Sequence, residues 1–175
     1  MEERLHNYVE VNRLLEIPPQ HMLIDAAAHL RRLCQSISRS RADCKGIELI
    51  VQDSVQLDSE RCWRLSVIVF ELVTNFAHAF GAGGGTIRVE LLPRGPVVQC
   101  RVEGNWTTAE EIRLGRVSTI VEALVASLDG TINQYFGPRA AVSNLIFPPF
   151  ARSRKQNELA TSGAPKSLSP NPLSD

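Results

Sequence analysis

A long apolar segment followed by a glycine-rich run is the feature that most constrains the fold. Residues 65–80 carry apolar side chains at helical spacing, and the run Gly-Ala-Gly-Gly-Gly at residues 81–85 then leads into an alternating stretch at Thr86–Leu92. The first pattern predicts a helix packed against a sheet, and the second predicts a strand. Within the helix, Glu71 and Asn75 stand four residues apart, so both lie on one face. The chain therefore places a carboxylate and a carboxamide beside a predicted sheet.

The Glu71 and Asn75 pair suits a magnesium–nucleotide site. Hard cations prefer oxygen ligands, and a Glu beside a metal-bound phosphate can act as a base or position a water molecule. Taken alone, the pair is better explained as two polar residues at the rim of an amphipathic helix. The glycine run at residues 81–85 is expected to be a permissive turn and not a phosphate loop, because it follows a helix and opens a strand.

Length and composition indicate a single domain with a proper core. The chain has 175 residues, 43% of them hydrophobic, and equal numbers of basic and acidic residues, 19 each. We therefore expect no nucleic-acid partner and no acidic membrane surface. The chain has no apolar stretch of about 18 residues and no apolar signal core at its start, which favours a cytoplasmic protein. The irregular spacing of the cysteines predicts reduced, mostly buried thiols at Cys34, Cys44, Cys62 and Cys100.

Periodicity and turn signals predict an α+β or α/β fold. A short helix is expected within residues 1–17 and is broken by Pro18 and Pro19. Three more helices are predicted: one from near Leu23 with Asp25 in its first turn, one capped by Asp58 or Ser59, and Ser118–Leu128 with Asp129 and Gly130 as its C-cap. The predicted strands are Ile47–Val51, Thr86–Leu92, Val97–Glu103, Thr131–Phe136 and Val142–Phe147.

The run Leu65–Phe80, with the following Gly-Gly-Thr-Ile-Arg-Val, resembles the N-box of sensor histidine kinases. These kinases belong to the GHKL ATPase superfamily shared with gyrase, MutL and the large heat-shock chaperone. The resemblance continues at residues 98–105 and 115–124 and ends in residues 128–132 and 142–148. It is closest to the short-lid kinases of the HWE type. It implies a Bergerat-type ATP-binding fold, an α/β sandwich in which helices cover one face of a mixed sheet of about five strands.

The resemblance also divides the chain. It covers residues 21–149, the expected ATPase domain. Residues 1–20 would be a short helix left from a dimerisation region, too short for a two-helix hairpin. Residues 150–175 are rich in Ser, Pro and charged residues and are expected to form a disordered tail.

Three residues of the predicted helix acquire roles through the resemblance. In these kinases the Glu that matches Glu71 positions or activates the attacking group, and the Asn that matches Asn75 ligates magnesium. His78 follows Asn75 by three residues, where the family has a basic residue. Either His78 takes that place as a phosphate contact, or one residue is missing from the helix and His78 is a buried or rim histidine. ATP and Mg²⁺ are the implied cofactors, with weak binding or none.

The first glycine box of the family is degenerate here. It normally reads Asp-x-Gly, and its Asp accepts a hydrogen bond from the adenine amino group. The natural register puts Gly104 at the Asp and Trp106 at the Gly, with Asn105 between them as a cofactor contact. Glu103 cannot substitute, because adjacent strand residues point to opposite faces. Losing the acceptor leaves the adenine donor unpaired, at a cost of about 1–3 kcal/mol.

The later boxes are degenerate as well. The second reads Gly115-Arg116-Val117, where Gly115 and Arg116 are the expected phosphate contacts and Val117 crowds the approach of a ligand. In the last box, Ala140 and Ala141 replace a Gly-Thr or Gly-Ser pair. Restoring the boxes by Gly104→Asp, Trp106→Gly and Val117→Gly together is expected to raise ATP affinity by about an order of magnitude or more.

The resemblance therefore implies a two-component signalling protein, a module that transfers the ATP γ-phosphate to a histidine with impaired activity. The partner would be a response regulator or a histidine-containing phosphoacceptor protein, and the chain could pair as a homodimer. Two alternatives stay open. One is a non-catalytic pseudokinase or phosphotransfer scaffold that binds a response regulator or a kinase. The other is an anti-sigma-type serine kinase with the same fold.

Overall fold

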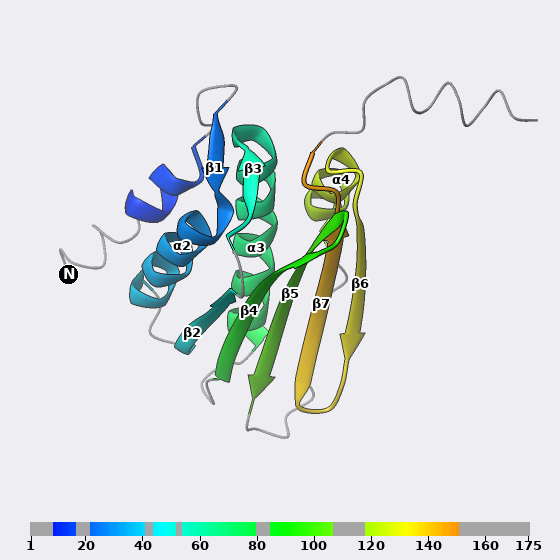
Figure 1. Cartoon of the computed structure of the whole chain (residues 1–175). Coiled ribbons are helices and arrows are strands. Elements are labelled where there is room, and N and C mark those ends of the chain that lie inside the picture. The colour runs from blue at the N-terminus through cyan, green and yellow to red at the C-terminus, as the bar shows by residue number, and fades with distance from the viewer. Residues whose placement is uncertain are drawn as a thin grey trace, which may run out of the picture.

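A computed structural model describes residues 9–16, 22–40, 44–51, 54–79, 85–106 and 118–150. Its centre is a five-stranded sheet in the order β2-β4-β5-β7-β6 (Figure 1). β2 runs parallel to β4, and the other neighbours are antiparallel, so the sheet is mixed as expected. The strands are β2 (Cys44–Val51), β4 (Gly85–Arg94), β5 (Val97–Trp106), β6 (Thr131–Phe136) and β7 (Ala140–Phe147).

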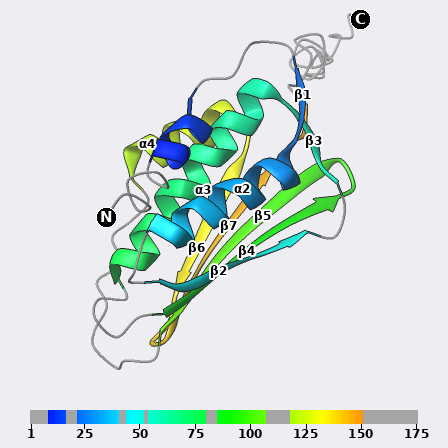
Figure 2. The same cartoon turned by 90° about the vertical axis from the view of Figure 1, so that its left-hand side faces the viewer.

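Three helices cover one face of this sheet, as the side view in Figure 2 shows. They are α2 (Ala26–Ser40), α3 (Ser59–Ala79) and α4 (Thr119–Ser127). Alternate residues of β5 are buried, namely Val98, Cys100, Val102, Gly104 and Trp106. Because successive strand residues point to opposite faces, these buried positions are the ones that face the helices. The predicted α/β sandwich, with helices on one side of a five-stranded mixed sheet, is confirmed.

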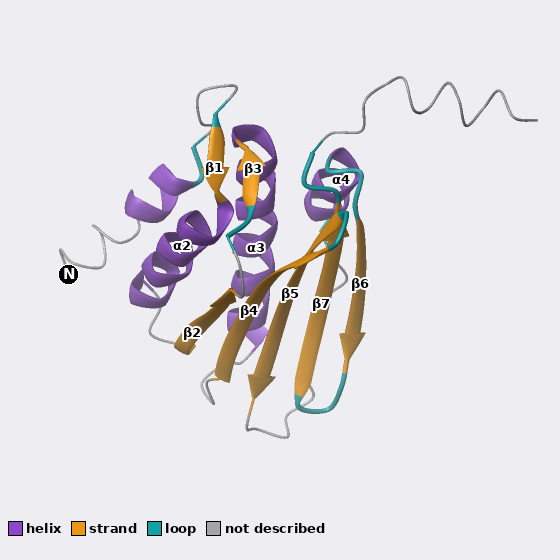
Figure 3. Cartoon of the chain, viewed as in Figure 1, coloured by secondary structure: helices purple, strands orange, loops and turns teal. Residues whose placement is uncertain are grey.

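A second, two-stranded sheet lies beside α2 and α3 (Figure 3) and is absent from the sequence prediction. It pairs β1 (Leu23–Asp25) with β3 (Gln56–Asp58) in antiparallel register. The helix predicted to start near Leu23 therefore begins later, at Ala26. The Asp25 carboxylate caps it by accepting the backbone N–H of Ala27 at 2.9 Å. Strands of three residues are too short to show a period in the sequence.

The structure also shows which residues cap the start of α3 and the end of α4. Asp58 accepts the backbone N–H of Arg61 at 2.8 Å, so Asp58 and not Ser59 caps α3. At the end of α4 the C-cap is Leu128, and the left-handed residue after it is Asp129, with φ of 53°. Helix α4 therefore ends at the predicted pair Asp129 and Gly130, and of these two residues it is Asp129 that takes the left-handed conformation.

The described part of the N-terminal segment packs onto the same core. Val11 and Leu14 are buried, and the Trp63 indole Nε1–H donates to the carbonyl oxygen of Leu15 at 2.8 Å. Residues 9–16 thus contact α3 directly. Residues 1–8 and 17–21, and residues 151–175 of the predicted tail, lie outside the described residues.

Three thiols are buried and free, as predicted for Cys34, Cys62 and Cys100. Burial raises the pKa of each to about 12, so these thiols stay protonated and unreactive. None of the helices in the described ranges is long and apolar enough to cross a bilayer.

Candidate functional site

The polar residues of the predicted site line one edge of α3. Glu71 is half-buried, whereas Asn75 and His78 are exposed. Their spacing of four and then three residues puts all three side chains on one helical face. Between them, Leu72, Val73, Phe76 and Ala77 are buried and face the sheet. The structure therefore brings Glu71, Asn75 and His78 together on a rim that is open to solvent.

Beside this rim, Phe76 lies directly on the backbone of β5. A Cβ built at Gly104 would stand 3.0 Å from Cδ2, 3.1 Å from Cγ and 3.2 Å from Cβ of Phe76. The Phe76 side chain is 2% exposed, so the ring is enclosed. Gly104 is the position at which the resemblance places the adenine-binding Asp. A phenyl ring therefore fills the space in front of that position.

Trp106, two residues further along β5, faces the same way. It is buried, and its indole Nε1–H donates to the carbonyl oxygen of Pro138 at 3.1 Å. Its backbone N–H donates to the carbonyl oxygen of Arg139, also at 3.1 Å. Both acceptors belong to the turn between β6 and β7. Trp106 is thus fixed against this turn, in the position where the family has a small glycine.

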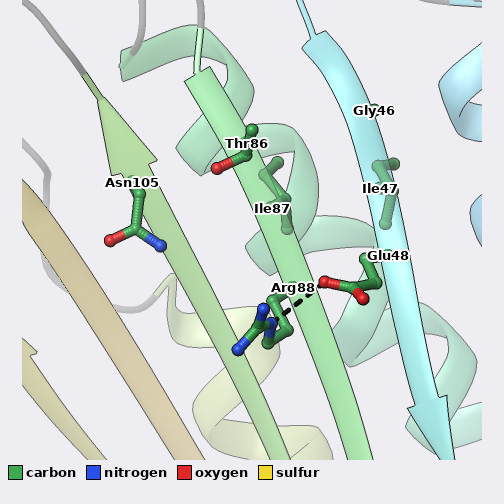
Figure 4. A pocket seen from close by; sticks show the side chains of 7 residues that line it. All are labelled: Gly46, Ile47, Glu48, Thr86, Ile87, Arg88 and Asn105. Carbon is green, nitrogen blue, oxygen red and sulfur yellow. Dashed lines mark hydrogen bonds and ion pairs between the residues drawn. The ribbon is translucent and has the colours of Figure 1, made fainter.

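Asn105 points to the opposite face of the sheet. It is exposed and lines a pocket of about 450 Å³ together with Gly46, Ile47, Glu48, Thr86, Ile87 and Arg88 (Figure 4). Across this pocket, Arg88 Nε donates to Glu48 Oε2 at 3.1 Å. The Asn105 amide donates to Glu103 Oε1 at 3.2 Å. The structure therefore does not bring Asn105, or its neighbour Glu103, together with Glu71 and Asn75.

The expected phosphate contacts Gly115 and Arg116 lie within residues 107–117, outside the described part of the chain. In the part that is described, no three His, Cys, Asp or Glu side chains gather in a way that could hold a metal ion. Asn75, the expected magnesium ligand, has an exposed side chain.

No protein-family model and no curated protein matches the sequence. Among solved structures, the chain is similar to the histidine kinase domain of a blue-light-activated histidine kinase from Erythrobacter litoralis. The TM-score is 0.62 at 22% identity, over 83% of this chain and 79% of that one. Against a second structure of the same kinase the identity is 24% and the TM-score 0.59, and the chain spans 47% of its length.

Two other solved structures extend the likeness. The ATP-binding domain of PrrB from Mycobacterium tuberculosis matches with a TM-score of 0.57 and 17% identity, over 76% of this chain and all of that one. A bacterial phosphotransferase matches with a TM-score of 0.58 and 10% identity, over 80% of this chain and 72% of that one. This chain has the fold of a histidine kinase ATP-binding domain.

The described residues beside Gly104, where the resemblance places the adenine, are apolar. On the sheet beneath Phe76, Gly104 has Ile87 and Ala141 as its register partners, and both are buried. None of these side chains offers an acceptor to an adenine amino group. An unpaired donor in such a place costs about 1–3 kcal/mol, even before the ring is displaced. At the position where the resemblance places the adenine, the described side chains of Phe76, Ile87 and Ala141 are therefore all apolar.

Proposed function

We propose that this chain is a two-component signalling module that acts by binding a partner protein and not by transferring phosphate from ATP. The partner is a response regulator or a histidine-containing phosphoacceptor protein. The observation that supports the proposal is the contact between Phe76 and Gly104, at the position where the resemblance places the adenine. The same proposal includes a cytoplasmic location and permits a homodimer.

A histidine kinase fold does not by itself require kinase activity, because one fold can carry several functions. The degenerate boxes of this chain are consistent with a scaffold role, because binding a protein partner requires no adenine pocket.

A second candidate function is a histidine kinase of low activity. The retained rim of Glu71, Asn75 and His78 favours it, since these side chains share one open edge of α3. In this case Asn75 would hold Mg²⁺, Glu71 would position the attacking group, and His78, Gly115 and Arg116 would contact the phosphates. When bound, Mg²⁺–ATP would supply the phosphoryl group, and the acceptor histidine would come from a partner.

Calorimetric titration with Mg²⁺–ATP separates the two candidates. We expect no binding by the purified chain up to millimolar nucleotide, and no difference for Glu71→Ala or Asn75→Ala. Asn75 is exposed, so Asn75→Ala leaves the fold intact and tests only ligand binding. Micromolar binding that Asn75→Ala weakens would support the kinase and contradict the scaffold.

Binding to partner proteins tests the scaffold directly. Purified receiver domains and histidine phosphotransfer domains are titrated with the fluorescently labelled chain, and the anisotropy is followed. We expect saturable binding to at least one of them, with the same affinity for the wild type and for Asn75→Ala. Absence of binding to every domain of the panel would count against a role in two-component signalling.

A further inference from the structure

We propose that the side chain of Phe76 takes the place of the nucleotide base and closes the base site of this domain from within. The inference deepens the proposed function and rests on it for the assignment of the base site to the inner face of β5. The site is closed because the Phe76 side chain occupies the space that a bound adenine would fill.

The first support is the contact with β5. Ordinary carbon contacts lie near 3.5–4.0 Å, whereas a Cβ at Gly104 would lie 3.0 Å from the Phe76 ring. A side chain at position 104 would require the Phe76 ring to shift by a few tenths of an ångström. The ring can lie this close to β5 because position 104 carries no side chain.

The second support is the direction of the neighbouring side chains on α3. Asn75 is exposed and Phe76 is 2% exposed, although they are consecutive residues. Consecutive helical residues point about 100° apart, so the ring enters the fold immediately beside the polar rim. The phenyl ring of Phe76 therefore lies beside the polar rim, in the place that the base of a bound nucleotide would take.

The third support is the apolar character of the two residues that flank Gly104 in the sheet. Gly104 is flanked in register by Ile87, 1% exposed, and Ala141, fully buried. Trp106, next along the inner face of β5, has its indole N–H turned to Pro138. A phenyl ring needs no hydrogen-bond partner, so it is satisfied where an adenine amino group is not.

This geometry changes which substitutions should open the site. Gly104→Asp alone, even with Trp106→Gly and Val117→Gly, places a side chain against the Phe76 ring. Truncation of Phe76 to Ala removes the ring and leaves an apolar space that a planar ligand can enter. With the ring gone, Gly104→Asp adds the acceptor that the adenine amino group requires.

The experiment measures binding of adenine and of Mg²⁺–ADP to four forms of the full chain by calorimetry and thermal shift. These are the wild type, Phe76→Ala, Phe76→Ala with Gly104→Asp, and the control Phe147→Ala. Phe147 is also buried but pairs with Val98 near the other end of β5. We expect no binding by the wild type or the control, and at least tenfold tighter adenine binding by the double variant than by Phe76→Ala.

Two results would overturn the inference. One is saturable adenine binding by the wild type, an outcome that requires no variant to fold. The other is a folded double variant that binds adenine no better than Phe147→Ala. If Phe76→Ala does not fold, Phe76→Val with Gly104→Asp is measured in the same way. Binding of receiver domains by the wild type does not depend on these titrations. The two measurements therefore distinguish a failure of this inference from a failure of the scaffold function.

Discussion

The guanidinium of Arg61 donates to the carbonyl oxygen of Leu128 at 2.9 Å, linking the first turn of α3 to the end of α4. The same Nη1 donates to the carbonyl oxygen of Pro148 at 2.9 Å, just after β7, and Nη2 lies 3.2 Å from the Asp129 carboxylate. Arg61 is 3% exposed. One buried cation thus joins the ends of three elements that lie far apart in the sequence.

Arg61→Met is expected to destabilise the fold by about 3 kcal/mol, because it removes the donor from the buried carbonyl oxygen of Leu128 and from the half-buried one of Pro148. Urea unfolding followed by circular dichroism measures the change. The matched control is Arg88→Met, which removes an exposed ion pair with Glu48 and should cost at most about 1 kcal/mol. Equal costs for the two variants would show that Arg61 has no special structural role.

We expect the free energy of unfolding to depend on pH because of the half-buried His29. Burial lowers its pKa, with a smaller contribution from the Arg32 charge, and a hydrogen bond to the Leu14 backbone acts in the opposite direction. The folded state therefore binds this proton less readily than the unfolded state, whose histidine titrates near 6.5. Stability is fully present above that pH and falls as the pH drops toward the lowered pKa, by at most about 1.4 kcal/mol per unit.

Unfolding free energies at pH 7.5 and pH 5.5 test this dependence. His29→Gln should remove part of the loss between the two values. His78→Gln, at an exposed position of α3, should retain the wild-type loss. Identical pH profiles for the wild type and His29→Gln would exclude His29 as the source.

The sequence was sufficient for the parts of the fold with long, regular patterns. The apolar spacing from Leu65 onward predicts α3, and the alternation of Cys100 and Val102 with Arg101 and Glu103 predicts β5. That same alternation, carried two residues further, indicates that Asn105 faces away from the helices. The resemblance implies a cofactor contact for Asn105 although this alternation points its side chain away from the helices. The structure places the side chain on the open face.

The contact between Phe76 and Gly104 could not be read from the sequence. Periodicity places Phe76 in the apolar stripe of α3, but the strand residue beneath it depends on how far α3 is shifted along β5. That shift is fixed by tertiary packing, including the Arg61 contacts at the other end of α3. The strands β1 and β3 could not be predicted from the sequence either, because a strand of three residues shows no periodicity.

Trp63→Phe is expected to loosen residues 9–16 while leaving the rest of the fold in place. The variant keeps an aromatic ring but removes the N–H that donates to Leu15, at a cost of about 1 kcal/mol. Hydrogen exchange should become faster at the amides of Leu15 and Glu16, which bond to carbonyls within the segment. Amides of β5 serve as the internal control, and faster exchange there as well would indicate global destabilisation instead.

Gly130→Ala is expected to destabilise the fold by about 2 kcal/mol through overpacking. A Cβ at this position would lie 2.9 Å from the carbonyl oxygen of Ile146 and 3.3 Å from that of Val125. Both atoms belong to the backbone, so neither can move without shifting β7 or α4. The glycine is thus required for the close approach of these elements and not for a left-handed turn.

The control for this prediction is Gly95, in the turn between β4 and β5. A Cβ there meets nothing within 4 Å, but the residue has φ of +61°. Gly95→Ala should cost about 1 kcal/mol through backbone strain alone, and Gly95→Asn should recover part of it, because Asn tolerates the left-handed region. At Gly130 the cost comes from the Cβ, so Gly130→Asn should be no better than Gly130→Ala. Recovery by Asn at both positions, measured by thermal unfolding, would show that Gly130 also acts through its backbone conformation.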